Sequence, residues 1–171
     1  MSLLAGPFVA AAVLLAVAGV PKLFRPASTA GAVASLRLPS SALLVRLLGA
    51  VELVLAGSAL LTGSAYAAVG IAVAYAGFAG FVGLALARPQ TLGSCGCFGR
   101  PDTPPTPAHL VVNLAAVAVA VAVAVTGGVR LDLAGQPLLG LPFLGLTAVV
   151  AWFGYLSLAL LPRVSAKAYR S

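Results

Sequence analysis

The two cysteines of the chain lie one residue apart, in the stretch GSCGCFGR at residues 93–100. A disulfide between Cys95 and Cys97 would close a small, strained ring, and strained exposed disulfides exchange readily with other thiols. Gly96, between them, permits the unusual backbone that such a ring needs. The spacing therefore indicates a redox pair, with Cys95 and Cys97 as the catalytic thiols.

Three other interpretations of the pair stay open. Two thiolates, with His109 as a third ligand, could bind a soft metal such as Hg(II) or Cu(I), although Met1 as the sole methionine argues against copper traffic. A structural zinc site normally needs four ligands, and only Asp102 and His109 stand near the pair. Both cysteines could also be buried small hydrophobic residues.

Glu52 and His109 are the other candidate catalytic residues. Glu52 falls near the middle of an apolar segment, where a carboxylate is costly unless it is protonated or paired. It could accept a proton or pair with Lys22, Arg46 or His109, but Arg46 lies on another face of the helix. His109 follows the cysteines and begins the next apolar segment. It could be a general acid or base, a metal ligand or an ordinary histidine at a helix start. Asn113, one turn on, could orient it.

Lys22 and Trp152 are candidate cofactor-binding residues. Lys22 follows the first apolar segment, where it could anchor the helix at the membrane interface or supply positive charge to the site. Trp152 and Tyr155 are one turn apart. Such a pair is typical of packing or of the aromatic belt at the membrane surface, and it could also form a platform for a quinone.

The elements that must position these residues are membrane helices. Hydrophobic residues make up 61% of the 171 positions and charged residues 8%, with a mean hydropathy of +1.12, whereas a soluble domain is about a quarter charged. The composition predicts one all-α integral membrane domain, a polytopic helical bundle in contact with lipid. About five spans are expected, near residues 3–20, 40–61, 65–87, 108–125 and 137–161, with a cysteine loop over 88–107.

Several details refine this topology. The first span lacks the basic start and the cleavage site of a secretory leader. The short turn near residues 62–64 predicts a helical hairpin, and Thr106-Pro107 predicts a helix start. Residues 27–38 could lie along the membrane surface.

The charge distribution favours a membrane and argues against a nucleic-acid partner. The net charge is +7, but the basic residues are scattered at segment ends, which is typical of topology-setting and phospholipid-facing charge. With five spans, nearly all of them fall on the side of the cysteine loop, and Arg130 stands on the other. The positive-inside rule then places the cysteines in the cytoplasm of a multi-pass protein of the inner or plasma membrane.

Three motifs carry a resemblance to a known family. They are Gly19-Val20-Pro21-Lys22-Leu23 with Pro26, then Glu52, and above all Cys95-Gly96-Cys97-Phe98-Gly99. In order and spacing, over roughly residues 1 to 127, the chain resembles the MauE/DoxX family of redox-associated membrane proteins. The resemblance implies a DoxX-like four-helix core, here with one C-terminal helix added, and thiol–disulfide electron transfer beside a thioredoxin-like partner.

The resemblance also implies cysteines outside the cytoplasm, opposite to the charge count. A quinone acceptor follows by analogy with the membrane disulfide-forming enzymes, but this chain has C-x-C instead of C-x-x-C and no second pair. It can therefore exchange with a partner but cannot relay electrons between two internal disulfides. The expected function is a membrane thiol–disulfide oxidoreductase component, coupled to a thioredoxin-like protein and to membrane quinone. The alternatives are a soft-metal carrier and a non-catalytic scaffold for a redox partner.

Overall fold

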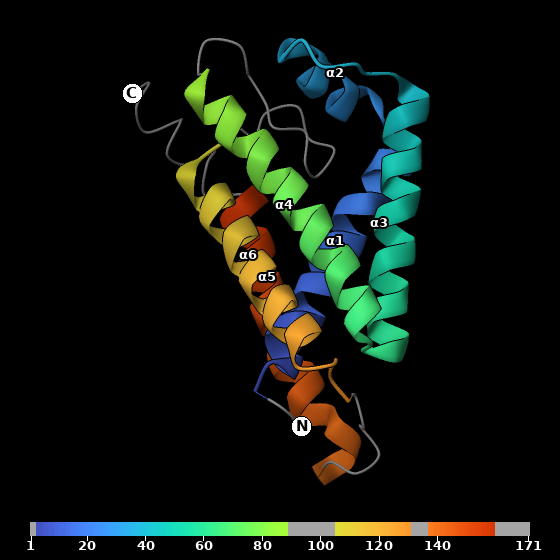
Figure 1. Ribbon diagram of the computed structural model, residues 1–171, viewed down its shortest axis with the longest axis vertical. Helices are drawn as coiled ribbons and strands as arrows, with labels where there is room; N and C mark the ends of the chain where they lie inside the picture. Colours follow the sequence, from blue (N-terminus) through green and yellow to red (C-terminus); the bar gives the residue numbers. More distant parts are fainter. Residues whose placement is uncertain (1–2, 89–104, 131–136, 160–171) are drawn as a thin grey trace.

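The computed structural model describes residues 3–88, 105–130 and 137–159, and this part of the chain is helical, with no strand (Figure 1). The prediction of an all-α helical bundle is confirmed. The elements are α1 (Ala5–Phe24), α2 (Ala27–Ser35), α3 (Ala42–Thr62), α4 (Ala65–Ala87), α5 (Pro107–Val125), the 3-10 turn η2 (Pro137–Gly140) and α6 (Leu141–Ala159).

Four of these helices, α1, α3, α4 and α5, are long and apolar enough to cross a membrane. A fifth apolar helix, α6, has a shorter apolar stretch, Leu141–Leu156. The outward face of α3 exposes large apolar side chains such as Leu43, Leu47 and Val54. An apolar face of this extent is unfavourable in water, so we assign it to contact with the hydrocarbon of the bilayer.

The first helix runs further than expected. The first span was expected to end near residue 20, but α1 continues to Phe24 and includes Pro21. Proline removes one backbone hydrogen bond, to the carbonyl four residues earlier. In the last turn this is a small cost, because few further helical hydrogen bonds follow it. The extra turn places Lys22 on the helix itself.

The helices pack as two main pairs, α1 with α3 and α4 with α5, while α6 lies against α1 and α5. Phe8, Leu15, Ile71 and Val123 are fully buried between them. The short helix α2 contacts α3 at one end of the bundle (top of Figure 1). Two of its residues, Thr29 and Ala32, are buried.

Two turns meet at the opposite end. Gly63 ends α3 with a positive φ of 57°, and Ser64 caps α4 by accepting a bond from the amide of Ala67. The amide of Val129, just after α5, donates to the carbonyl oxygen of Gly63 at 2.8 Å. Residues 64 and 128 form an isolated β-bridge. The predicted α3–α4 hairpin is thereby joined to the end of α5 through its backbone.

The C-terminal ends of α1 and α4 and the N-terminal ends of α3 and α5 share the end of the bundle where α2 lies (Figure 1). The segment that carries the cysteines leaves α4 after Arg88 and enters α5 at Pro107, so both of its anchors are at this end. Cys95 and Cys97 themselves lie outside the described residues.

Candidate functional site

Two glycines bring α1 and α3 into close contact. A Cβ atom built on Gly19 would lie 2.9 Å from the carbonyl oxygen of Gly49, and one on Gly49 would lie 2.7 Å from that of Gly19 and 2.9 Å from the Cβ atom of Lys22. Real Cβ atoms do not approach other atoms this closely. Glycine at both positions therefore permits the approach that puts Lys22 beside α3, as small residues do between membrane helices.

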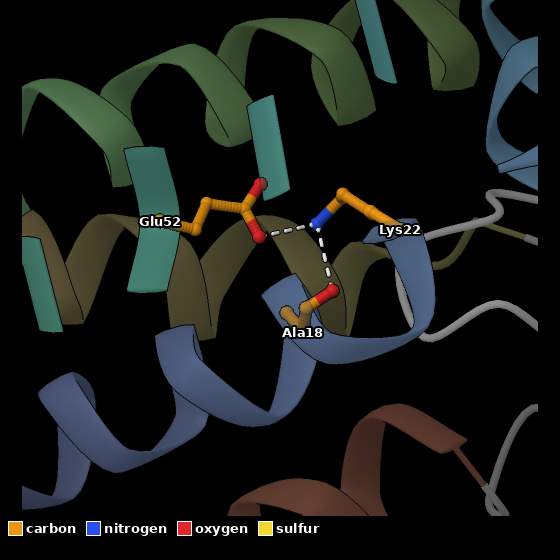
Figure 2. A network of polar contacts seen from close by, with 3 residues as sticks. All are labelled: Ala18, Lys22 and Glu52. Atoms are coloured by element: carbon orange, nitrogen blue, oxygen red, sulfur yellow. Dashed lines mark hydrogen bonds and ion pairs between the residues drawn. The ribbon is translucent and has the colours of Figure 1, made fainter. Parts of the chain in front are cut away.

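Lys22 and Glu52 form an ion pair at this crossing. The Nζ atom of Lys22 lies 2.7 Å from Oε2 of Glu52 and also donates to the carbonyl oxygen of Ala18 at 3.1 Å (Figure 2). Lys22 is 2% exposed and Glu52 is 0% exposed. A buried pair of this kind is tolerated because each charge removes the need to hydrate the other. Lys22 is thus part of the site and not an exposed interface anchor.

Aromatic side chains of α4 surround the pair. Nζ of Lys22 lies 5.0 Å from the centre of the Phe78 ring, within the range of a cation–π contact. Tyr75 packs edge-to-face against Phe78, with ring centres 5.9 Å apart, and its hydroxyl donates to the carbonyl oxygen of Ala11 at 2.8 Å. The Tyr75 bond ties α4 to α1 beside the charged pair.

His109 sits in the first turn of α5, which begins as predicted with Thr106 as N-cap and Pro107 at the first helical position. The backbone amide of Thr106 donates to Nδ1 of His109 at 3.3 Å, and the Thr106 hydroxyl oxygen lies 2.8 Å from the same atom. The ring is 2% exposed, and its Nε2 atom has no hydrogen-bond partner within the described residues. Thr106, and not Asn113, holds the ring in position.

These residues line one cavity of about 600 Å³. Its wall is mostly apolar, and its polar members are Lys22, Thr29, Glu52, Tyr75, His109 and Asn113. His109 and Asn113 come from one face of α5, as their spacing predicted, while Thr29 comes from α2 at the end of the bundle. The structure therefore brings together Lys22, Glu52 and His109, three of the candidates named from the sequence.

Other candidates lie elsewhere. Trp152, on α6, is 60% exposed, stacks against Tyr155 with ring centres 5.8 Å apart, and does not line the cavity. Arg46 is exposed on α3 and is not the partner of Glu52. The described residues hold no cluster of three potential metal ligands, and the alternative metal set of Cys95, Cys97 and His109 falls partly outside them.

Sequence reasoning missed Phe78 and Thr29 as site residues. Tyr75 and Phe78 are three residues apart on α4, the spacing that places two side chains on one helix face. This spacing could have predicted that the two aromatic side chains lie together. Thr29 offered no such signal, because its place depends on how the short helix α2 folds back over the end of the bundle.

The fold and the site together define a small multi-pass membrane protein, a helical bundle with a buried ion pair and a histidine around an apolar cavity. A family model described as methylamine utilisation protein MauE matches residues 1–126, so the chain belongs to the MauE family. The match includes Lys22, Glu52, His109 and both cysteines and ends after α5, leaving α6 and Trp152 outside it. Comparisons with curated proteins and with solved structures each gave no match.

Proposed function

We propose that the protein is the membrane component of a thiol–disulfide exchange system, in which Cys95 and Cys97 exchange with a thioredoxin-like protein. When the pair is oxidised, a thiolate of the partner attacks one sulfur and forms a mixed disulfide. The partner's second thiolate then releases it. The partner becomes a disulfide, Cys95 and Cys97 become thiols, and two electrons and two protons have moved. The reverse reaction follows the same path.

One observation supports this proposal above the others. Lys22, in the last turns of α1, and His109, in the first turn of α5, lie at the end of the bundle where the cysteine-bearing segment is anchored, and together with Glu52 they line one cavity. An apolar bundle has no structural need for a buried carboxylate, ammonium and imidazole together, and intramembrane ionisable groups usually mark proton or substrate pathways. Thiol–disulfide chemistry requires groups that take up and return protons, and Glu52 and His109 are of that type.

Turnover also requires a second reactant that resets the pair. For a protein within a cell membrane we propose a quinone in this role, because quinones accept two electrons and two protons and dissolve in the bilayer.

The test uses a thioredoxin whose second active-site cysteine is replaced by serine, incubated with the full-length protein in lipid nanodiscs. The wild type and the single variants Cys95→Ser and Cys97→Ser are compared on non-reducing gels. We expect a mixed disulfide with one single variant and none with the double variant. The double mutant with an added Ser41→Cys change, at an exposed position at the start of α3, is the control for non-specific trapping.

The proposal fails if neither single variant forms the adduct and the double variant keeps the full activity of the wild type in its cell. Retained activity without cysteines would point to a scaffold. Metal analysis of the purified protein addresses the carrier alternative, since one equivalent of Hg(II) or Cu(I) and no titratable disulfide would support it.

A further inference from the structure

The cavity holds two buried polar atoms that no described residue satisfies. They are Oε1 of Glu52 and Nε2 of His109. A buried polar atom without a partner is expensive, and in native proteins it usually marks a place for a ligand or water. Both residues line the same cavity.

The hydrogen-bonding role of each atom follows from its neighbours. The backbone amide of Thr106 is a donor only, so Nδ1 of His109, which it contacts, acts as the acceptor. In the neutral imidazole the proton then resides on Nε2, which becomes a donor pointing away from the cap. Oε1 of Glu52 is an acceptor, because a carboxylate carries no proton to donate and its Oε2 already accepts the hydrogen bond from Lys22. The cavity therefore offers one hydrogen-bond donor and one acceptor to an uncharged ligand.

The site is also close to neutral overall. The positive charge of Lys22 and the negative charge of Glu52 are 2.7 Å apart and compensate each other. Nζ already bonds to Glu52 and to the carbonyl oxygen of Ala18. A fatty acid or an anionic phospholipid head group would bring an uncompensated charge into this apolar wall. An uncharged head group is favoured.

The cavity is open between α3 and α4. Val51 on α3 and Val73 on α4 both line it, yet they are 54% and 67% exposed, and Gly77 on α4 is exposed as well. Both helices are membrane-spanning in length, so this apolar rim faces hydrocarbon. A ligand can enter from within the bilayer, and it must itself be soluble in lipid.

We propose that the cavity binds the head group of an isoprenoid quinone, with the ring oxygens of the hydroquinone form accepting a hydrogen bond from Nε2 of His109 and donating one to Oε1 of Glu52. The ring would lie among the aromatic and aliphatic side chains of the wall, and the isoprenoid tail would leave between α3 and α4. The volume of about 600 Å³ falls within the range of small-molecule sites.

This inference rests on the proposed function and supplies the electron acceptor that the oxidation of the two thiols requires. The dithiol of Cys95 and Cys97 loses two electrons and two protons and becomes a disulfide. The quinone gains both and becomes a hydroquinone. Glu52 and His109 would contact the reacting oxygens of the quinone, so they are the catalytic residues of this half-reaction.

The test measures binding directly. The full chain is purified in quinone-free phosphatidylcholine nanodiscs and titrated with decylubiquinol and decylubiquinone, and bound quinone is quantified by chromatography after gel filtration. The cysteine-free double variant is measured in parallel. We expect the cysteine-free protein to bind as well as the wild type, which separates the ligand site from the thiol chemistry: binding without mixed-disulfide formation would reject the proposed function alone.

Matched glycine variants locate the site. Gly77 lines the cavity and Gly80, one turn on, does not, and an added Cβ meets nothing within 4 Å at either position. We expect Gly77→Leu to weaken quinol binding at least about tenfold and Gly80→Leu to leave it unchanged. Val73→Trp, at the rim, is a second blocking variant should Gly77→Leu not fold.

A polar variant tests the hydroxyl contact. His109→Gln keeps the cap, because glutamine three residues after an N-cap threonine accepts the same backbone amide, but it removes the ring donor. We expect about a three- to tenfold loss for quinol. Three results would each overturn the proposal. They are equal quinol binding by Gly77→Leu and Gly80→Leu, quinol binding by the protein no better than by empty nanodiscs, and displacement of the quinol by stoichiometric oleate or phosphatidylglycerol.

Discussion

The ion pair between Lys22 and Glu52 gives the sharpest prediction about stability. Its atoms are 2.7 Å apart and both side chains are almost fully buried. At an effective dielectric constant of about 20, the Coulomb attraction at this distance is about 6 kcal/mol. Most of that offsets the desolvation of the two groups, so the pair as a whole contributes little net stability.

Removing one partner is different, because the other charge then stays buried and unpaired. We expect Lys22→Met and Glu52→Leu each to lower the free energy of unfolding by about 3–5 kcal/mol. The double variant Lys22→Met/Glu52→Leu should lose less than either single variant, since no charge is left behind. Arg46→Met is the control: Arg46 is on α3 but exposed, so its loss should change stability by less than about 0.5 kcal/mol.

The assay is reversible unfolding in mixed micelles by titration with a denaturing detergent, followed by far-ultraviolet circular dichroism. The four proteins of the cycle give the coupling energy between the two residues directly. Additive losses in the double variant, or single losses near that of Arg46→Met, would refute the reasoning. The first result would mean that the two side chains do not interact, and the second that neither charge is buried.

Two further predictions follow from the same packing, and a third follows from the charge distribution. Gly49→Ala should destabilise the bundle by about 1–3 kcal/mol in the same assay, because the new Cβ would meet the carbonyl oxygen of Gly19. Gly57→Ala is the control: its new Cβ meets nothing within 4 Å, so the change should be neutral or slightly stabilising. Equal effects of the two substitutions would contradict the close helix crossing. Tyr75→Phe should lower the free energy of unfolding by about 1 kcal/mol, because the hydrogen bond to the Ala11 carbonyl is lost. Tyr66→Phe, at a side chain 91% exposed, should leave it unchanged. No effect of Tyr75→Phe would mean that its hydroxyl does not make this bond. The charge distribution predicts that a membrane-impermeant maleimide does not label Cys95 or Cys97 in intact cells and does so after permeabilisation; labelling from outside would reverse this orientation.

The helices themselves could be predicted from the sequence, since apolar length decides a membrane span. The start of α5 at Thr106-Pro107 was predictable too, because its cap is encoded locally. The end of α1 was not predicted, since the span was expected to end near residue 20, whereas the helix continues to Phe24 because a proline in the last turn removes only one hydrogen bond.

The site was only partly predictable. Its position within an apolar segment marked Glu52 as a residue in need of a partner, but both Lys22 and His109 stayed open as that partner. The choice of Lys22 depends on the contact between Gly19 and Gly49, which are distant in the sequence. The cavity depends on five elements at once, and no local pattern encodes it. The unsatisfied nitrogen of His109 is visible only once Thr106 is seen to occupy the other nitrogen of the ring.

The bond from Val129 to Gly63 has a mechanical consequence. It fastens the α3–α4 turn to the end of α5, so these three helices share a fixed pivot at one end of the molecule. A rotation about a pivot displaces the far ends most. Any spreading of α3 from α4 is therefore largest at the opposite end, where the imidazole of His109 lies in the first turn of α5, and a bulky lipid-soluble molecule could pass there while the pivot stays closed.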